Sequence, residues 1–182
     1  MNVLYKELTA HHEISIYDTT TLFGEKGSFR VLEFSNQAMQ GAIDLEHPDR
    51  ILFEYPRAMI HLMALNGPHY ERVFLIGHGI GTIANHLKEK RFKVAELDAH
   101  VVALSRQFFG YSQDNVYIGD GRQILHNESP RTYDYILVDA FTEKGTPLPL
   151  TSLNFFQMAG EKLDTEGAIL LNLMGKGEND PL

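Results

Sequence analysis

The sequence has 182 residues, of which 43% are hydrophobic and 22% charged, and its formal net charge at pH 7 is −8. These values are typical of one globular domain with a substantial core, and the acidic balance without a lysine/arginine cluster disfavours a nucleic-acid-binding surface. The sequence contains no cysteine, which excludes disulfides, cysteine nucleophiles and thiolate metal sites.

Targeting signals and metal-binding patterns are also missing from the sequence. The first residues lack the apolar centre of a signal peptide, and there is no run of about 18 apolar residues that could form a membrane-spanning helix. The nine histidines do not form the His-x-x-x-His pairs that bind metals on a helix. We therefore expect a cytoplasmic protein with no metal site, whose partners include neither a membrane nor nucleic acid.

Residues 1–55 have the pattern of a small antiparallel β unit. Polar and apolar residues alternate over 13–18 and again over 29–34, which predicts two strands, and turn-forming residues occupy 22–27 between them. A third strand is predicted within 39–45. Because a unit of this size is too small to be stable alone, we expect a β-hairpin unit that packs on the rest of the chain.

Residues 56–182 alternate between strands and helices. Pro56 opens a helix that ends before residue 66. This order predicts a doubly wound, mostly parallel Rossmann-like α/β domain over 56–182. Because such sheets often have more than five strands, the sequence leaves open whether it is a short variant or a piece of a longer chain. The strands are predicted at 72–76, 92–97, 115–118, 133–139 and 167–173, and the helices between and around them at 81–90, 99–109, 121–127 and 151–163.

The first of these strands leads directly into a glycine-rich loop. Four apolar residues, 73–76, are followed by Gly77, Gly79 and Gly81. A continuous apolar run is typical of a strand that is buried on both faces. Glycines allow a tight turn and a close approach of a ligand to the backbone, where free N–H groups favour an electron-rich ligand. The pattern predicts a nucleotide-binding βαβ unit, with His78 in the glycine loop, where its side chain either contacts the ligand or points to solvent.

Acidic residues follow three successive strands of this domain. Glu96 lies about 20 residues after the first glycine, where such units have a ribose-binding acid, and Asp98 is the second candidate. The alternative is that Glu96 is a solvated strand end and Asp98 caps the next helix. Asp120, between two glycines, either contacts a ligand or caps the helix that follows it. Asp139 leaves an apolar strand at the edge where parallel sheets bind ligands, and otherwise it ends that strand and caps the loop.

Together, these motifs resemble those of the spermidine synthases (polyamine aminopropyltransferases), which share the fold of S-adenosylmethionine-dependent methyltransferases. No single motif is specific, but their order and spacing agree with the family's. The matching segments are Leu75-Ile76-Gly77-His78-Gly79-Ile80-Gly81 in the glycine loop, Glu96-Leu97-Asp98, Gly119-Asp120-Gly121, the strand at 133–139 and the segment at 149–156.

The resemblance implies a class I methyltransferase-like fold and a transferase that moves an aminopropyl group to an amine acceptor. Its co-substrate would be decarboxylated S-adenosylmethionine or S-adenosylmethionine, and the family forms a homodimer through its N-terminal β unit. Glu96 would bind the ribose hydroxyls, Asp120 the adenine amino group and Asp139, as the catalytic carboxylate, the amine. Gln40 and Tyr55 lie where the family closes over its ligand, and Tyr55 is a second catalytic and substrate-binding candidate. The remaining cofactor-binding candidates are Gly77, His78, Gly79, Ile80, Gly81, Leu97 and Gly121.

Two positions depart from the family's pattern. Ile80 replaces the loop aspartate that holds the aminopropyl ammonium group. The family's Asp-x-x-Asp is Asp139-Ala140-Phe141-Thr142 here, so Glu143 is the neighbouring carboxylate that could bind the substrate. Both departures weaken the expected recognition of a cationic tail.

Three alternative functions remain open, and the first two follow from these departures. Ile80 also fits a methyltransferase that uses S-adenosylmethionine, although methyltransferases commonly have an acid at the position of Leu75. A non-catalytic nucleoside-binding homologue or scaffold is the second alternative. A dehydrogenase is more distant, because Thr82 occupies the third glycine position of Gly-x-Gly-x-x-Gly.

Overall fold

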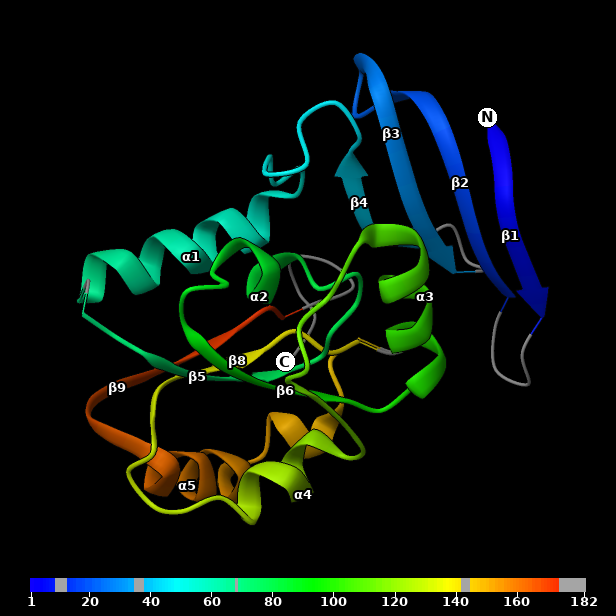
Figure 1. The fold of residues 1–182 in the computed structure, drawn as a ribbon. Coiled ribbons are helices and arrows are strands. Elements are labelled where there is room, and N and C mark those ends of the chain that lie inside the picture. Colours follow the sequence, from blue (N-terminus) through cyan, green and yellow to red (C-terminus); the bar gives the residue numbers. More distant parts are fainter. Residues whose placement is uncertain (9–12, 35–37, 68, 142–144, 174–182) are drawn as a thin grey trace, which may run out of the picture.

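The computed structural model describes residues 1–8, 13–34, 38–67, 69–141 and 145–173. These residues form two sheets: a four-stranded antiparallel sheet from the N-terminal part and a five-stranded parallel sheet covered by helices (Figure 1). The α/β fold with a parallel sheet and a small N-terminal antiparallel unit is thereby confirmed. The domain boundary at residue 55 stays a prediction.

The antiparallel sheet has four strands in sequential order: β1 (Asn2–Leu8), β2 (Glu13–Leu22), β3 (Glu25–Phe34) and β4 (Ala38–Asp44). Apolar side chains point alternately to the two faces of this sheet along β2 and β3, and both faces are partly covered. Ile16 and Leu32 belong to a buried cluster on one face, and Val31 belongs to another cluster on the opposite face. The sequence did not predict β1. Its residues are mostly exposed, so that strand lacks the buried, alternating pattern on which such a prediction depends.

The parallel sheet has the strand order β7-β6-β5-β8-β9, and every neighbouring pair is parallel. The chain first adds strands on one side of β5 and then crosses to the other side with β8. Between β5 and β8 lies the switch point at which open sheets of this kind bind ligands. The strands are β5 (Arg72–Ile76), β6 (Arg91–Glu96), β7 (Val116–Ile118), β8 (Tyr133–Val138) and β9 (Leu163–Leu171).

Helices cover both faces of this sheet (Figure 1). The face of Val73 and Leu75 packs against α1 (Glu54–Asn66) and α2 (Thr82–His86). The face of Phe74 and Ile76 packs against α4 (Gly121–His126) and α5 (Leu153–Lys162), and a short 3-10 helix at Leu148–Leu150 precedes α5. The continuous apolar run at residues 73–76 is explained by this two-sided burial.

Helix α2 is shorter than the predicted 81–90. It ends at His86, and a turn in which the Lys90 N–H donates to the Leu87 carbonyl follows it. This turn lets the Arg91 N–H bond the Glu71 carbonyl at 2.8 Å, which starts β6 beside β5. Continuing the helix to residue 90 would remove that first link between the two strands.

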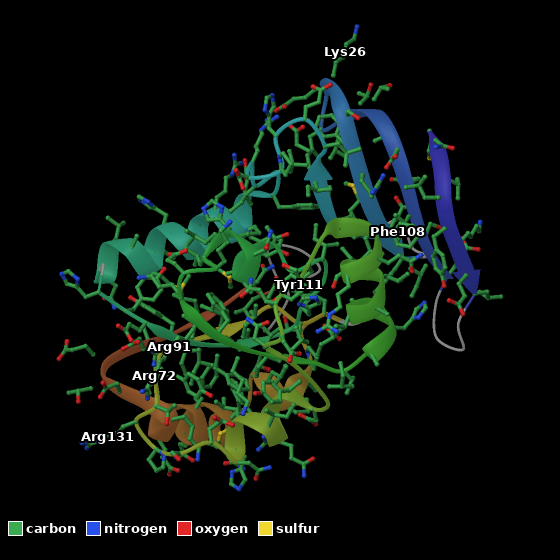
Figure 2. The ribbon with its side chains drawn as sticks, in the orientation of Figure 1. Lys26, Arg72, Arg91, Phe108, Tyr111 and Arg131 are labelled. Carbon is green, nitrogen blue, oxygen red and sulfur yellow. The ribbon has the colours of Figure 1, made fainter. Side chains whose placement is uncertain are left out.

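The two sheets are joined through α3 (Ala99–Phe109). The guanidinium of Arg30 on β3 pairs with Asp18 and donates to the carbonyl oxygen of Phe108 at 2.9 Å. Phe108 lies where α3 meets the N-terminal sheet (Figure 2), and its ring packs 5.8 Å from that of Tyr5. The polar link and the aromatic contact join the antiparallel sheet to the C-terminal end of α3.

Candidate active site

The glycine loop after β5 contacts the end of β8 directly. Gly77 has φ +98°, and a Cβ atom there would overlap the carbonyl oxygen of Asp139. The Asp139 N–H in turn donates to the Ile76 carbonyl oxygen at 2.8 Å. Only glycine fits at this position, and its presence brings the loop and Asp139 together at the switch point.

Asp139 is partly buried, and two neutral donors hold its carboxylate. The Tyr55 hydroxyl, from the first turn of α1, donates to Oδ2 at 3.1 Å, and the Asn172 amide, just after β9, donates to Oδ1 at 3.1 Å. Burial raises the pKa of Asp139, and the hydrogen bonds from Asn172 and Tyr55 oppose that rise. Burial and the nearby charge of Asp139 raise the pKa of Tyr55, so its hydroxyl stays a donor at neutral pH.

Sequence reasoning did not single out Asn172. The available signal was its place near the carboxyl end of a predicted strand, which is the same edge of the sheet as Asp139. The interacting pair is 33 residues apart in the chain, so no local motif contains both.

Glu96 is held by the backbone of the glycine loop and of its own strand end. Its Oε2 accepts from the His78 N–H at 2.8 Å and its Oε1 from the Asp98 N–H at 2.9 Å. Burial raises the pKa of Glu96, and the backbone donors of Asp98, His78 and Leu97 oppose that rise. The Asp98 carboxylate accepts from the His100 N–H at 2.8 Å and caps α3, which is the capping interpretation that the sequence left open.

The His78 side chain packs beneath the loop rather than facing solvent. Ser105 Oγ donates to the Val102 carbonyl oxygen, so at 2.7 Å His78 Nε2 is the donor to Ser105 Oγ. Burial, with a contribution from Arg106, lowers the pKa of His78 to about 4, which keeps the imidazole neutral. Its ring meets that of Tyr111 edge-on at 4.5 Å, and among the described residues its buried Nδ1 has no hydrogen-bond partner.

Ile80 and Gln40 bring the antiparallel sheet against the loop. The Ile80 side chain is buried, and a Cβ atom at Gly41 of β4 would lie 2.7 Å from its Cγ1. A Cβ atom at Gly79 would lie 3.5 Å from the Gln40 carbonyl oxygen. The loop is thus enclosed by β4 on one side and by the tip of β8 on the other.

The remaining candidates lie at the tips of β6 and β7. Leu97 follows Glu96 and is 76% exposed. Asp120 caps α4, and its Oδ1 accepts from the Arg122 and Gln123 N–H groups at 2.8 and 3.3 Å, so Oδ2 is the oxygen that can meet a ligand. Gly121 lets the start of α4 pack on Ile76 of β5. Glu143 lies outside the described residues, and the binding roles of all these residues stay predictions.

Within the described ranges, no group of three or more His, Cys, Asp or Glu side chains could hold a metal ion. None of the helices described here is both long and apolar enough to cross a membrane. The cytoplasmic location and the homodimer stay predictions.

A family model described as the spermine/spermidine synthase domain matches residues 52–174, a range that begins just before α1 and extends past the last residue of β9. The chain belongs to this family. The family assignment made from the motifs is therefore confirmed.

The sequences of two curated relatives, whose names belong to the same family, are similar to this chain. Spermidine synthase 2 of Datura stramonium is 26% identical over 178 residues, which is 92% of this chain and 52% of the relative. A polyamine aminopropyltransferase of Vibrio vulnificus is 27% identical over 175 residues, which is 89% of this chain and 58% of the relative. The chain thus spans about half the length of these relatives.

Solved structures match the fold. A probable spermidine synthase from Corynebacterium glutamicum superposes with a TM-score of 0.80 at 22% identity, covering 95% of this chain and 64% of that one. Human methyltransferase-like protein 13 in complex with SAH superposes with a TM-score of 0.58 at 23% identity, covering 64% of this chain and 63% of that one. The methyltransferase-like fold is confirmed.

Proposed function

We propose that this chain binds decarboxylated S-adenosylmethionine over the glycine loop and transfers its aminopropyl group to an amine acceptor. The observation that carries the proposal is Asp139, a partly buried carboxylate that lies against Gly77 of the glycine loop and is held by Tyr55 and Asn172. Family membership and the relative named polyamine aminopropyltransferase support the reaction class.

The proposed reaction is an in-line displacement at the carbon next to the sulfonium. The amine nitrogen forms the new C–N bond, the C–S bond breaks, and its electron pair stays on sulfur, which leaves methylthioadenosine as a neutral thioether. An alkyl ammonium has a pKa of about 10, as lysine does. A base is therefore required to remove its proton, so that the amine nitrogen has a lone pair with which to attack. Asp139 takes that proton, and burial favours this because it raises the pKa of the carboxyl.

The nucleoside would occupy the tips of β5, β6 and β7. In this proposal Glu96 accepts from the ribose hydroxyls, Asp120 Oδ2 accepts from the adenine amino group, and the exposed Leu97 packs against the base. Gln40 closes the site from β4. Holding the two reactants in line accounts for much of the rate, since alignment alone can supply roughly 7–11 kcal/mol.

The test is turnover by the full chain with decarboxylated S-adenosylmethionine and putrescine, with chromatographic detection of methylthioadenosine and spermidine. Asp139→Asn keeps the shape of the side chain but removes the base, so kcat should fall by about 100-fold or more. Asp114→Asn, at a fully exposed carboxylate, is the matched control and should retain the rate. Absence of product with every diamine and triamine tried would refute aminopropyl transfer.

Methyl transfer from S-adenosylmethionine is a second candidate function. The observation in its favour is Ile80, whose buried apolar side chain stands where the family has a carboxylate for the aminopropyl ammonium. Calorimetric titration with both co-substrates separates the two candidates. Tighter binding of S-adenosylmethionine than of the decarboxylated form would favour methyl transfer.

A further inference from the structure

Asn172 lies one residue beyond β9, beside the residue that follows β8. Its backbone N–H donates to the Val138 carbonyl oxygen at 2.9 Å, and its side-chain amide reaches Asp139 Oδ1 at 3.1 Å. We propose that Asn172 is a positioning residue, whose amide fixes the orientation of the Asp139 carboxylate and stabilises its charged form. The catalytic consequence of this inference rests on the proposed function, whereas the effect on Asp139 does not.

The backbone of Asn172 sets the direction of its side chain. Val138 pairs with Leu171 in the parallel β8–β9 ladder, and the Asn172 N–H continues the ladder by one bond. The residue after each strand therefore lies at the same level of the sheet edge. The amide needs no long, flexible side chain to reach the carboxylate, so little rotamer entropy is lost in forming the bond.

Asn172 and Tyr55 together fix the plane of the carboxylate. Asn172 follows β9 whereas Tyr55 lies in α1, and each donates to a different oxygen at 3.1 Å. A carboxylate offers about four acceptor positions, so one donor on each oxygen leaves the other positions for an incoming ammonium group. With a single donor the group could rotate, and the free oxygen would lose its fixed direction.

The charge of Asp139 depends on these neutral donors. Among the described residues, the side chains that face Asp139 and alter its pKa are Tyr55 from α1 and Asn172 from β9, and neither is a cation. Burying a carboxylate without donors favours its neutral form. Because an amide does not titrate, Asn172 supports the charged form over the whole working pH range.

The experiment measures the pKa of Asp139 directly, in the absence of any ligand. The full chain is labelled with ¹³C at aspartate side chains, and the Asp139 signal is assigned from its loss in Asp139→Asn. Asn172→Leu removes the donor at similar size and should raise the pKa of Asp139 by about one unit, the scale of one hydrogen bond to a charged group. Asn172→Gln keeps the amide and should bring the pKa back towards that of the unmodified chain.

Asn154→Leu, at an exposed amide on α5, is the matched control and should leave the pKa of Asp139 unchanged. If Asn172→Leu does not fold, Asn172→Val replaces it, since a β-branched side chain suits a strand end. An unchanged pKa of Asp139 in a folded Asn172→Leu or Asn172→Val protein would overturn the proposal. A lower melting temperature without a change in that pKa would mean a structural role only, and would overturn it as well.

Turnover supplies the second measurement. Because the base must be charged to accept a proton, a higher pKa of Asp139 moves the acidic limb of the kcat profile to higher pH by the same amount. The expected result is a shift of about one pH unit in Asn172→Leu, with partial return in Asn172→Gln. If the unmodified chain turns over no substrate, the proposed function fails, and the NMR titration still decides the role of Asn172.

Discussion

Two partly buried carboxylates at the edge of the parallel sheet are stabilised by different kinds of donor. Glu96 accepts from two backbone N–H groups, one from the glycine loop and one just after β6, which the path of the chain supplies whatever the side chains are. Asp139 accepts from two side chains, Tyr55 and Asn172, which single substitutions can remove. Substitution can therefore tune the properties of Asp139 independently, whereas those of Glu96 follow from the fold.

Replacing Glu96 by Gln should weaken nucleoside binding and destabilise the loop together. The NH₂ group of Gln would face one of the two backbone N–H groups, which then loses its acceptor inside the protein. We expect affinity for methylthioadenosine to fall by about tenfold or more, and the melting temperature to fall as well. Asp98→Asn is the control, because Asn caps helices as well as Asp and the α3 cap is retained. Equal loss of affinity in both variants, measured by calorimetry, would contradict the ribose role of Glu96.

The neutral imidazole of His78 should give the protein a pH-dependent stability. In the unfolded chain it protonates near pH 6.5, whereas in the folded protein its pKa is about 4. Between these values the unfolded state binds more protons, so the free energy of unfolding falls as the pH drops from about 6.5 towards 4. The contribution at neutral pH is at most about 3 kcal/mol.

Chemical denaturation of the unmodified chain and of His78→Phe from pH 4 to 7 measures that contribution. Phe keeps the edge-on ring contact with Tyr111 but cannot titrate, so the pH slope should be smaller in the variant. The two proteins must be compared with each other, because the raised pKa of Glu96 and of Asp139 makes the free energy of unfolding change with pH in the opposite direction. Both proteins share those two carboxylates, so the difference between their slopes reports on His78. Identical slopes would mean that the histidine does not resist protonation in the fold.

At the scale of elements, Arg30 links the N-terminal sheet to α3, beside the contacts of His100 with Glu7 and Tyr5. Arg30 forms two bonds with Asp18, of 2.8 and 3.1 Å, and a third with the last turn of α3 at Phe108. A cation at a helix C-terminus also interacts favourably with the helix dipole. This link is mostly screened from water by the two elements, unlike the more exposed pair of Arg50 and Glu25.

Arg30→Met should therefore weaken the packing of the antiparallel sheet against α3. Methionine retains much of the aliphatic stem but none of the donors, and we expect the free energy of unfolding to fall by about 1 kcal/mol, since the partly exposed charges are screened by solvent. Lys6→Met removes the more exposed ion pair of Lys6 with Glu13 and should have a smaller effect. Urea unfolding of both variants tests this, and a larger loss of stability in Lys6→Met would contradict the role given to Arg30.

The elements predicted best from the sequence are those buried on both sides. Residues 73–76 form a continuous apolar run, and the structure places their side chains alternately against α1 and α2 on one face and against α4 and α5 on the other. Strand β1 was missed because its stability comes from pairing with β2 rather than from its own pattern. The end of α2 was misplaced because the start of β6, not helix propensity, determines it.

The sequence predicted those parts of the candidate site that local motifs encode. Glycines and acids at strand ends identified the loop, Glu96 and Asp139 without knowledge of the tertiary structure. Asn172 could not be found in this way, since its partner lies on the neighbouring strand of the sheet and the pairing register aligns the two residues. Burial likewise decided that the His78 side chain lies inside, which the loop sequence left undetermined.

At the scale of the molecule, the ligand loop is the place where the two sheets meet. Ile80 belongs to the loop by sequence, yet its side chain is part of an apolar cluster with Ile14 and Leu32 of the antiparallel sheet and Leu104 of α3. Gly41 of β4 has no side chain at the point where Ile80 approaches. The position of the loop over β5 is thus set from both sheets, and changes in the N-terminal sheet should alter ligand binding.

A double-mutant cycle on Gly41 and Ile80 tests this coupling. Gly41→Ala should cost about 1–3 kcal/mol, because the added methyl group would lie 2.7 Å from Ile80 Cγ1 and would displace the loop. Ile80→Ala alone should cost about 2–5 kcal/mol through the lost buried side chain. In the double variant the new methyl group fills part of that space, so we expect the combined loss to be smaller than the sum by about 1 kcal/mol or more.

The affinity of the same proteins for methylthioadenosine distinguishes a displacement of the glycine loop from a general loss of stability. It should fall in Gly41→Ala and partly recover when Ile80→Ala is added, although the double variant remains less stable than the unmodified chain. Gly160→Ala on α5, where nothing lies within 4 Å of the added methyl group, is the control and should raise stability by about 0.5–1 kcal/mol without changing affinity. Two results together would contradict this coupling: losses of stability that add in the double variant, and an affinity for methylthioadenosine that Gly41→Ala leaves unchanged. They would mean that the antiparallel sheet stabilises the fold but does not determine the position of the glycine loop.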